Sequence, residues 1–329
     1  MKEKQSPVVA LLAADLHLSL RPPVARSAES DWMQTQAGYL DQLRKLATTL
    51  NPPKHKLGYK NAMWERDSLP IIIAGDYFDR HDPPPALINW ALTHLPRSHG
   101  VPGQHDLPHH RLDGLDKTAY GVLAKVGSII HLKPGEPLEI TSRGTVLRLH
   151  GFPWGVPVTP CKDRSDLTLE VAVIHQYFWL NERDAYPGAP VEQNARTTKW
   201  RKRLAGYDLA VFGDNHKPFQ RCKPGRPRVY NCGGFMRRKI DELDHRPSVG
   251  LLRADGSVGR HYLDVSKDQF ITPEHAAGAD FGDFLEQLRR LGDSALDFGE
   301  AVRRELGRPG VPAGVRRLLL GALEEGSGS

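Results

Sequence analysis

The chain of 329 residues has only three cysteines, and no two of them form a C-x-x-C pair. This scarcity argues against a disulfide framework or a cysteine-based zinc site, and it favours a reducing, cytoplasmic location. Long hydrophobic runs are also missing, since no stretch approaches the roughly 20 apolar residues that a membrane span needs. We therefore expect no membrane partner. A formal net charge of +6 is compatible with a polyanionic partner but does not require one.

The hydrophobic fraction of 39% and the charged fraction of 26% are those of a globular protein with one large domain or two ordinary ones. The N-terminus resembles a signal peptide, because positive residues precede an apolar run. That run is short, however, and Asp15 and His17 stand where a small-residue cleavage site would be expected. We therefore predict a buried first strand over residues 8–14 and a flexible tail for the terminal GSGS.

Apolar runs alternate with helical patterns along most of the chain, which predicts an α/β fold. Helices are expected at about residues 31–50, 83–95 and 119–125. The segment PLEITSRGTVLRLHG indicates a hairpin around Arg143 and Gly144, so the sheet is predicted to be mixed rather than purely parallel. Further strands are expected at the apolar runs LPIIIAG, VGSIIHL, LEVAVIH, DLAVFG and RVYNCGG.

The sequence pattern changes after about Val265, where amphipathic helical segments follow one another. We predict a catalytic domain at residues 1–265 and a helical segment at residues 266–329. This segment would form a small cap or a docking element for a partner. Helices packed directly on the main sheet are an alternative of at least equal weight.

Metal-capable side chains follow five apolar runs, at the point where each run ends. They are Asp15 and His17 in DLH, Asp76 in GDYFD, Gln104, His105 and Asp106 in GQHD, His175 in IHQ, and Asp214 and His216 in GDNH. Sites in α/β sheets form at the carboxyl ends of strands, so these loops are expected to converge at one edge. One such loop alone would more often be a solvated or capping turn. Five in order, each after an apolar run, favour a metal centre.

The chemistry of phosphoryl transfer suits this set of ligands. Mixed carboxylate, imidazole and amide ligands fit divalent ions such as manganese, iron or zinc. Two such ions about 3.5–4 Å apart can clamp the attacking and the leaving oxygen of a phosphoryl displacement. They also lower the pKa of a bridging water, which makes hydroxide available near neutral pH.

The order D-x-H, G-D-x-x-D, G-N-H-D, H and G-H-x-H resembles the calcineurin-like metallophosphoesterase superfamily, over about residues 8–235. Within it, the chain looks most like the SbcD-type DNA-repair exonucleases, including compact phage forms. The pointers are HGFPWG at 150–155, IHQ at 174–176 and NCGGFMRR at 231–238. The resemblance implies an α/β fold in which a mixed two-sheet β-sandwich is flanked by helices.

The resemblance also implies which residues hold two divalent metal ions. These are Asp15, His17 and His216 for one ion, Gln104, His175 and Asp214 for the other, and Asp76 as the bridge between them. It further implies that His105 stands near the scissile phosphate as general acid or transition-state stabiliser, oriented by Asp106.

Two positions depart from the superfamily pattern, because Gln104 replaces the usual Asn and Asp214 replaces the usual His. Glutamine keeps the carbonyl oxygen and adds one methylene. The carboxylate of Asp214 puts an anionic oxygen in place of a neutral nitrogen, which favours manganese or magnesium over zinc. We expect two manganese ions, with Mg²⁺, Fe²⁺ or Zn²⁺ as alternatives. A weakened second site is the other interpretation of these replacements.

Basic residues concentrate around the last two metal loops, in the segments 199–203, 217–228 and 237–239. Such runs suit contacts with a phosphate backbone, and the interleaved Trp200 and Phe219 would allow stacking. A solvated basic face is an almost equal alternative. The predicted DNA contacts are Lys199, Arg201, Lys202 and Arg203.

Three functions fit these patterns. The first is a metal-dependent DNA nuclease, exonuclease or endonuclease, whose C-terminal helices dock an SbcC-like ATPase and which could form a homodimer. The second is a small-substrate phosphodiesterase or a phosphoprotein phosphatase on the same fold. Phosphatases of that kind typically carry GDYVDRG, and GDYFDRHDPP lacks the final glycine. The third is a non-catalytic scaffold with a degenerate metal site, against which His105 beside an otherwise full ligand set argues.

Overall fold

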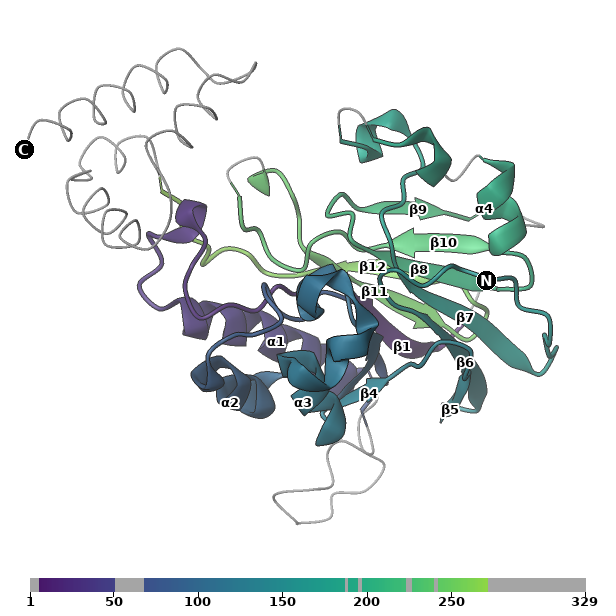
Figure 1. Ribbon diagram of the computed structural model, residues 1–329, viewed down its shortest axis with the longest axis horizontal. Helices are drawn as coiled ribbons and strands as arrows, with labels where there is room; N and C mark the ends of the chain where they lie inside the picture. Colours follow the sequence, from purple (N-terminus) through teal and green to yellow (C-terminus); the bar gives the residue numbers. More distant parts are fainter. Residues whose placement is uncertain are drawn as a thin grey trace, which may run out of the picture. The chain divides into compact units, whose positions relative to one another are not determined.

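The structure is a computed structural model that describes residues 6–50, 68–186, 189–194, 197–222, 227–239 and 242–271. Two six-stranded sheets form the body of the protein (Figure 1), in the strand orders β12-β11-β1-β2-β3-β4 and β5-β6-β7-β8-β10-β9. The first sheet contains β1 (Val8–Ala13), β2 (Ile71–Ala74), β3 (Ser98–Val101), β4 (Ile129–His131), β11 (Ser248–Arg253) and β12 (Val258–Tyr262). The second contains β5 (Leu138–Ser142), β6 (Thr145–Phe152), β7 (Thr168–His175), β8 (Leu209–Gly213), β9 (Phe219–Arg221) and β10 (Arg228–Asn231).

Both sheets are mixed, as the sequence predicted. Strands β1 to β4 are parallel to one another, whereas β11 pairs antiparallel with β1 and β12 pairs antiparallel with β11. In the second sheet, β6, β7, β8 and β10 are parallel, with antiparallel β5 and β9 at the edges. The β5–β6 hairpin turns at Arg143 and Gly144, which both have positive φ angles of 51° and 80°. This is the conformation that a two-residue hairpin requires.

Helices cover the outer faces of the sheets (Figure 1). α1 (Trp32–Thr49), α2 (Pro85–His94) and α3 (Ala119–Lys125) lie with the first sheet, and α4 (Thr198–Arg203) lies with the second. Asp31 caps the N-terminus of α1, because its carboxylate accepts a hydrogen bond from the Gln34 backbone amide at 2.9 Å. Within the described ranges, none of the helices combines the length and the apolar character needed to cross a bilayer.

The central strands are apolar throughout because both of their faces are buried. In β1, Leu11 and Ala13 pack in the cluster with the helices, whereas Ala10 and Leu12 pack in the cluster between the two sheets. A third cluster lies between the second sheet and α4, where Trp200 meets residues of β7 and β8. The core therefore has layers in the order helices, sheet, sheet, helix, as the α/β sandwich prediction required.

The compact unit that the structure describes extends to Phe270. Asp268 belongs to it, since its carboxylate accepts hydrogen bonds from Arg26, Arg237 and Tyr39 at 2.8 Å each. The helices predicted beyond residue 271, with their role as cap or docking element, lie outside the described residues, so that part of the domain prediction stays a prediction.

Candidate metal centre

The structure brings the five predicted loops together at the carboxyl ends of β1, β2, β3, β7 and β8. Asp15 and His17 follow β1, Asp76 follows β2, Gln104, His105 and Asp106 follow β3, His175 is the last residue of β7, and Asp214 and His216 follow β8. The two sheets therefore contribute to one site, because the parallel strands at their centres end at the same edge.

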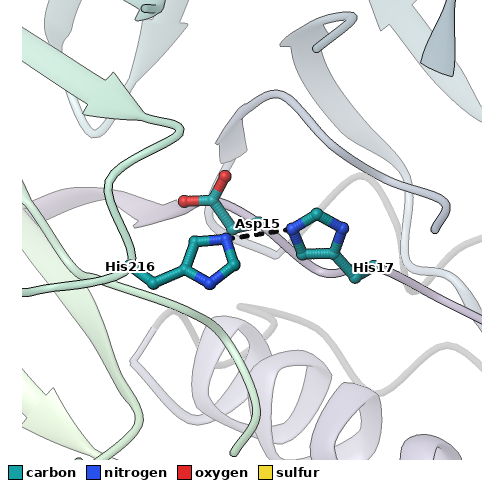
Figure 2. Close-up of side chains that lie close together, drawn as sticks. All are labelled: Asp15, His17 and His216. Atoms are coloured by element: carbon teal, nitrogen blue, oxygen red, sulfur yellow. Dashed lines mark hydrogen bonds between the residues drawn. The ribbon is translucent and has the colours of Figure 1, made fainter. Parts of the chain in front are cut away.

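Asp76 lies between the ligand sets predicted for the two ions. Its Oδ2 is 3.7 Å from His17 Nε2 on one side and 3.3 Å from His175 Nε2 on the other. His17 Nε2 is in turn 3.1 Å from His216 Nε2, and Asp15 completes that side (Figure 2). Ligand atoms of Asp15, His17 and His216 lie within 4.8 Å of one another, as do those of Asp15, Asp76 and His175.

The residues predicted for the second ion contact one another directly. The Gln104 side-chain oxygen is 2.8 Å from His175 Nε2, and its amide nitrogen donates to Asp214 Oδ1 at 2.7 Å. The added methylene of glutamine thus spans from His175 to Asp214. The Asp214 carboxylate contacts this ligand set through its hydrogen bond with Gln104. It is not part of the Asp15–His17–His216 group or of the Asp15–Asp76–His175 group.

Several buried polar atoms of the site have no hydrogen-bond partner among the described residues. They are Asp15 Oδ2, Asp76 Oδ2 and His17 Nδ1. A buried carboxylate oxygen without a partner costs about 1–3 kcal/mol or more. Asp15 and Asp76 are 1% and 0% exposed, so water does not relieve this cost. Buried carboxylate oxygens without a hydrogen bond, beside the Nε2 atoms of His17, His175 and His216, are the donor set that a divalent cation requires.

The pKa shifts of the site reflect its burial and, at His175, the carboxylates around it. Burial raises the pKa of Asp15 to about 6. Burial alone would lower the pKa of His175, but the charges of Asp76, Asp15 and Asp214 raise it to about 10. The carboxylates therefore draw a positive charge into the site, which is a proton on His175 here and would be displaced by a metal cation.

Four of the predicted ligands have left-handed backbone conformations. The φ angles of Asp15, His17, Asp76 and Asp214 are 55°, 46°, 53° and 74°. This conformation costs a non-glycine residue about 1–2 kcal/mol, although Asp tolerates it better than most. It turns each chain sharply where its strand ends, which directs the ligand side chains toward the shared edge. Strain concentrated in this way is typical of functional sites.

Two glycines in the ligand loops are required by the close approach of ligand side chains. A Cβ atom on Gly75, whose φ is 88°, would lie 2.0 Å from His175 Nδ1. A Cβ on Gly103 would lie 2.1 Å from Asp76 Oδ1. The glycines before Asp76 and Gln104 in the sequence therefore make room for the side chains that hold the centre.

His105 is held by a different partner from the one predicted. Its Nδ1 donates to the Asp79 carbonyl at 2.8 Å, which leaves Nε2 available to a substrate. Its ring meets the His17 ring edge-on with centroids 4.9 Å apart. The Asp79 carbonyl therefore orients the His105 ring, and the expectation that Asp106 does so is corrected.

Asp106 instead connects two of the ligand loops. Its fully buried carboxylate accepts hydrogen bonds from the backbone amides of Tyr77, Phe78 and Gly103 at 3.1, 3.0 and 2.9 Å. Burial and the charge of Asp76 raise the pKa of Asp106 to about 7. Asp106 thus fixes the β2 and β3 loops relative to each other and does not contact the His105 ring.

Two further carboxylates beside the centre were not predicted. Asp79 Oδ1 lies 3.8 Å from His17 Nδ1 and accepts a hydrogen bond from Arg238 at 2.8 Å. Glu242 Oε1 lies 3.5 Å from His216 Nδ1. Contacts of this kind orient a ligating imidazole. The second Asp of GDYFD was a signal for Asp79, whereas nothing in the sequence around Glu242 marks it.

The predicted DNA contacts lie on α4. Lys199, Arg201 and Lys202 are exposed and Arg203 is half-buried. Within the described ranges, no hydrogen bond or ion pair joins these four cations to the metal centre. The interleaved aromatic residues are not available for stacking, because Trp200 and Phe219 are only 2% and 5% exposed and pack in the core. That part of the prediction is wrong.

Comparison with known proteins gives the family. Residues 9–218 match the calcineurin-like phosphoesterase family, and the chain belongs to it. Members of this family bind two divalent metals, which indicates a metal-dependent phosphoester hydrolase. No curated protein matches the chain.

Two solved structures are similar to the chain at low identity. The Thermus thermophilus sulfate thiohydrolase SoxB in complex with glycerol has 12% identity and a TM-score of 0.44, over 87% of this chain and 61% of that one. The chain therefore spans about 61% of the SoxB chain. A second structure has 13% identity and a TM-score of 0.40, over 78% of this chain and 98% of that one.

Proposed function

We propose that this member of the calcineurin-like phosphoesterase family is a metal-dependent phosphodiesterase that cleaves DNA. The observation that carries the proposal is Asp76, whose buried Oδ2 makes no hydrogen bond and lies between His17 and His175. A single carboxylate oxygen in that position can serve two ligand sets at once. Two divalent ions held there would supply a water of lowered pKa and neutralise the charge that develops on the phosphodiester.

The residues of the chain have distinct tasks in this reaction. His105 presents Nε2 toward the leaving oxygen, because its Nδ1 donates to the Asp79 carbonyl. The carboxylates of Asp79 and Glu242 face the Nδ1 atoms of His17 and His216 at 3.8 and 3.5 Å, which favours ring orientations with Nε2 toward the centre. The buried walls around Asp15 and Asp76 exclude bulk water, which strengthens each electrostatic contact in the site.

The oxygen-rich second ligand set supports manganese or magnesium at that position. Gln104 offers an amide oxygen and Asp214 a carboxylate, where a zinc site would have more nitrogen. Both side chains already point toward His175 or toward each other. We infer that the second site is intact, with manganese as the metal that suits its mixed donors best.

The space beside the centre supports a substrate larger than a phosphomonoester. A cavity of about 880 Å³ has Asp214 and His216 in its wall. Its lining includes five Lys or Arg residues and three Asp or Glu residues. A wide cavity with an excess of cations suits the backbone of a nucleic acid strand.

The test compares metals and substrates with the same purified protein. After removal of metal with a chelator, cleavage of linear duplex DNA, of single-stranded DNA and of bis(p-nitrophenyl) phosphate should stop. Manganese should restore all three best, while p-nitrophenyl phosphate, a monoester, should remain a poor substrate. Full activity of the metal-free protein would refute metal dependence. Preference for the monoester would point to a phosphatase, and cleavage of the aryl diester alone to a small-substrate phosphodiesterase.

The contribution of α4 to DNA binding needs a separate measurement. Replacing Lys199, Arg201, Lys202 and Arg203 with Gln should weaken DNA binding and flatten its salt dependence, by up to about 0.9 in the log–log slope per lost duplex phosphate contact. A matched control removes four other exposed cations, at Arg111, Lys117, Lys125 and Lys133. Equal salt slopes in the two variants would identify α4 as a solvated basic face.

A further inference from the structure

Two tyrosines stand together in the wall of the cavity that borders the metal centre. The rings of Tyr177 and Tyr186 have centroids 4.8 Å apart at an interplanar angle of 58°. Both line the cavity that also contains Asp214 and His216. Tyr186 is 49% exposed, so packing in the core does not account for its position.

The two rings are fixed to each other and to the metal loop. The Tyr186 backbone amide donates to the Tyr177 hydroxyl at 3.0 Å. Lys217, the residue after His216, extends its ammonium to the carbonyls of Arg183 and Ala185 at 3.2 and 2.9 Å. The segment that carries Tyr186 is therefore bonded to the loop that carries two of the predicted ligands.

Asn215 strengthens this connection from inside the GDNH loop. Its side chain is 3% exposed and donates two hydrogen bonds of 2.8 Å, to the carbonyls of Phe178 and Asp184. Because Asn215 stands between Asp214 and His216, one amide couples the segment 178–184 to the ligand loop. The tyrosine rings are thus held at a set distance from the metal centre, as a recognition surface requires.

The charges around the tyrosines suit a phosphate-linked ligand. Arg183, Lys239 and Arg246 are exposed in the lining of the cavity, and the Arg246 guanidinium covers the Tyr262 ring at 4.1 Å. The carboxylates in this lining are Asp214, Glu242 and Asp244. Of these, Asp214 faces Gln104 and Glu242 faces His216, whereas Asp244 is exposed. Arg183 Nε lies 3.5 Å from Asp184 Oδ1, so Lys239 and Arg246 are the rim cations left for phosphates.

We propose that Tyr186, backed by Tyr177, is a stacking subsite for a nucleobase of the substrate that the metal centre cleaves. An aromatic face beside cations is how proteins bind unpaired bases without sequence preference. This subsite rests on the proposed phosphodiesterase function, and it defines the substrate as a phosphodiester that carries a base. Asn215 is a positioning residue for it, because it acts only through the segment that bears the rings.

The experiment uses manganese-loaded protein and short single-stranded oligodeoxynucleotides. One set carries normal bases, and the other carries a single abasic residue placed in turn at each position around the cleaved bond. Wild-type protein should lose roughly 5- to 150-fold in kcat/KM for an abasic residue at one position, the value of one stacked base. Tyr186→Ala should lose a similar factor on the normal strand and no longer distinguish the two strands.

Matched variants separate stacking from general damage. Tyr186→Phe keeps the ring and should behave as the wild type, since the backbone amide of residue 186, and not its hydroxyl, makes the bond to Tyr177. Leu167→Ala alters a side chain that is 88% exposed and lies outside the cavity lining, and it should have no effect. Equal losses in Tyr186→Phe and Tyr186→Ala would overturn the proposal.

Comparing an oligonucleotide with a dinucleotide as substrate shows whether the subsite binds a base within a strand or a small nucleotide. A Tyr186 effect with the oligonucleotide but not with a dinucleotide supports a base within a strand. An equal effect with both supports a nucleotide diester, and an effect with neither overturns the subsite. If abasic and normal strands are cleaved equally by all proteins, the subsite fails while the phosphodiesterase proposal survives.

Failure of the proposed function gives a different result. In that case manganese-loaded wild-type protein cleaves no phosphodiester at all. The subsite is then measured by fluorescence anisotropy of the same labelled oligonucleotides in chelator. A preference for the normal strand that Tyr186→Ala loses would support it, and equal binding of the normal and abasic strands would overturn it.

Discussion

Among the described residues, metal-capable side chains come within ligand distance in two regions, the metal centre and a second cluster, which differ in how their carboxylates are satisfied. The second cluster, separate from the metal centre, consists of His150, Cys161 and Glu170, whose ligand atoms lie within 4.8 Å of one another. The Glu170 carboxylate accepts hydrogen bonds from His150 at 2.6 Å and from the Thr168 hydroxyl at 2.7 Å, and the Ser165 amide adds a third at 3.3 Å.

The carboxylates of the metal centre are left with unpaired oxygens instead. Asp15 Oδ2 and Asp76 Oδ2 are buried and have no hydrogen-bond partner among the described residues. The pKa of Asp15 moves accordingly, since burial raises it to about 6. For Glu170, burial is outweighed by hydrogen bonds, chiefly from His150 and Thr168, which hold its pKa below the ordinary value. Residue types alone therefore do not make a metal site; unsatisfied lone pairs do.

The largest expected difference between the two groups is the response to removal of one carboxylate charge. Asp76→Asn keeps the side-chain shape but weakens a ligand that serves both ions. Metal content should fall, and hydrolysis should decrease by more than the roughly 10- to 100-fold that an outer-shell change costs. Glu170→Gln is the matched control and should keep both metal content and rate. Two ions per chain in Asp76→Asn, by elemental analysis, would show that Asp76 is not the bridge.

The next largest effect on the rate is expected at His105, and it distinguishes a catalytic role of this residue from metal ligation. His105→Asn should keep both ions and slow hydrolysis by about 10²–10⁴-fold, the range of a general acid or base. Asp106→Asn should act differently, because this carboxylate accepts three backbone amides and no contact joins it to the His105 ring. We expect it to lower the midpoint of thermal unfolding. Loss of metal from His105→Asn would make His105 a ligand.

A smaller effect on rate, with a change in metal preference, is expected at Asp214. Asp214→Ala should lose the second ion and keep the first, so hydrolysis should decrease because a lone ion cannot clamp both oxygens. Asp214→His replaces a hard oxygen with a softer nitrogen and should shift preference toward zinc. The measurement is metal content beside rate in manganese and in zinc. Two retained ions and the wild-type rate in Asp214→Ala would reduce Asp214 to a turn residue.

The smallest effect on activity, and a clear effect on stability, is expected at Glu170. Glu170→Gln leaves its donors without a charged acceptor and should lower the free energy of unfolding in urea by about 1–3 kcal/mol at pH 7. The pKa of Glu170 in the folded state lies below the ordinary 4.5, so its ionised carboxylate stabilises the protein above pH 4.5. This stabilisation is lost as the pH falls through the folded-state pKa. The difference from wild type should therefore shrink below about pH 4.5. A constant difference would contradict the role of the charge.

The central fold could be predicted because its strands are buried on both faces. Runs such as VVALLA and IIIA leave no polar position, and each ends in a polar loop. Strand β3, with the sequence SHGV, has no such pattern, and β12 alternates weakly because most of its residues are half-exposed or exposed. Those strands form because neighbouring strands offer them partners, which a local pattern does not reveal.

The ligand loops after β1, β2, β7 and β8 were predictable for the same reason, and their supporting contacts were not. Asp79 acts partly through its backbone carbonyl, and Asn215 acts on carbonyls more than thirty residues away in the sequence. The error at Trp200 has a similar origin. Its neighbours in the sequence are basic and exposed, but the turn of α4 points the indole into the core. Sequence proximity did not show on which side of the helix it lies.

Because several predicted ligands have a left-handed backbone, selection for stability and selection for catalytic turnover favour different residues at these positions. Glycine adopts the backbone of Asp15, Asp76 and Asp214 without strain. At Asp15 and Asp76 it would also remove a buried carboxylate oxygen that has no hydrogen bond. Variants selected for heat resistance alone, in a medium without metal, should therefore accumulate glycine at these positions and become inert. Growth under metal starvation would expose the chain to this drift. The ligand residues are retained only while a bound cation offsets the free-energy cost of their strained backbone and buried carboxylates.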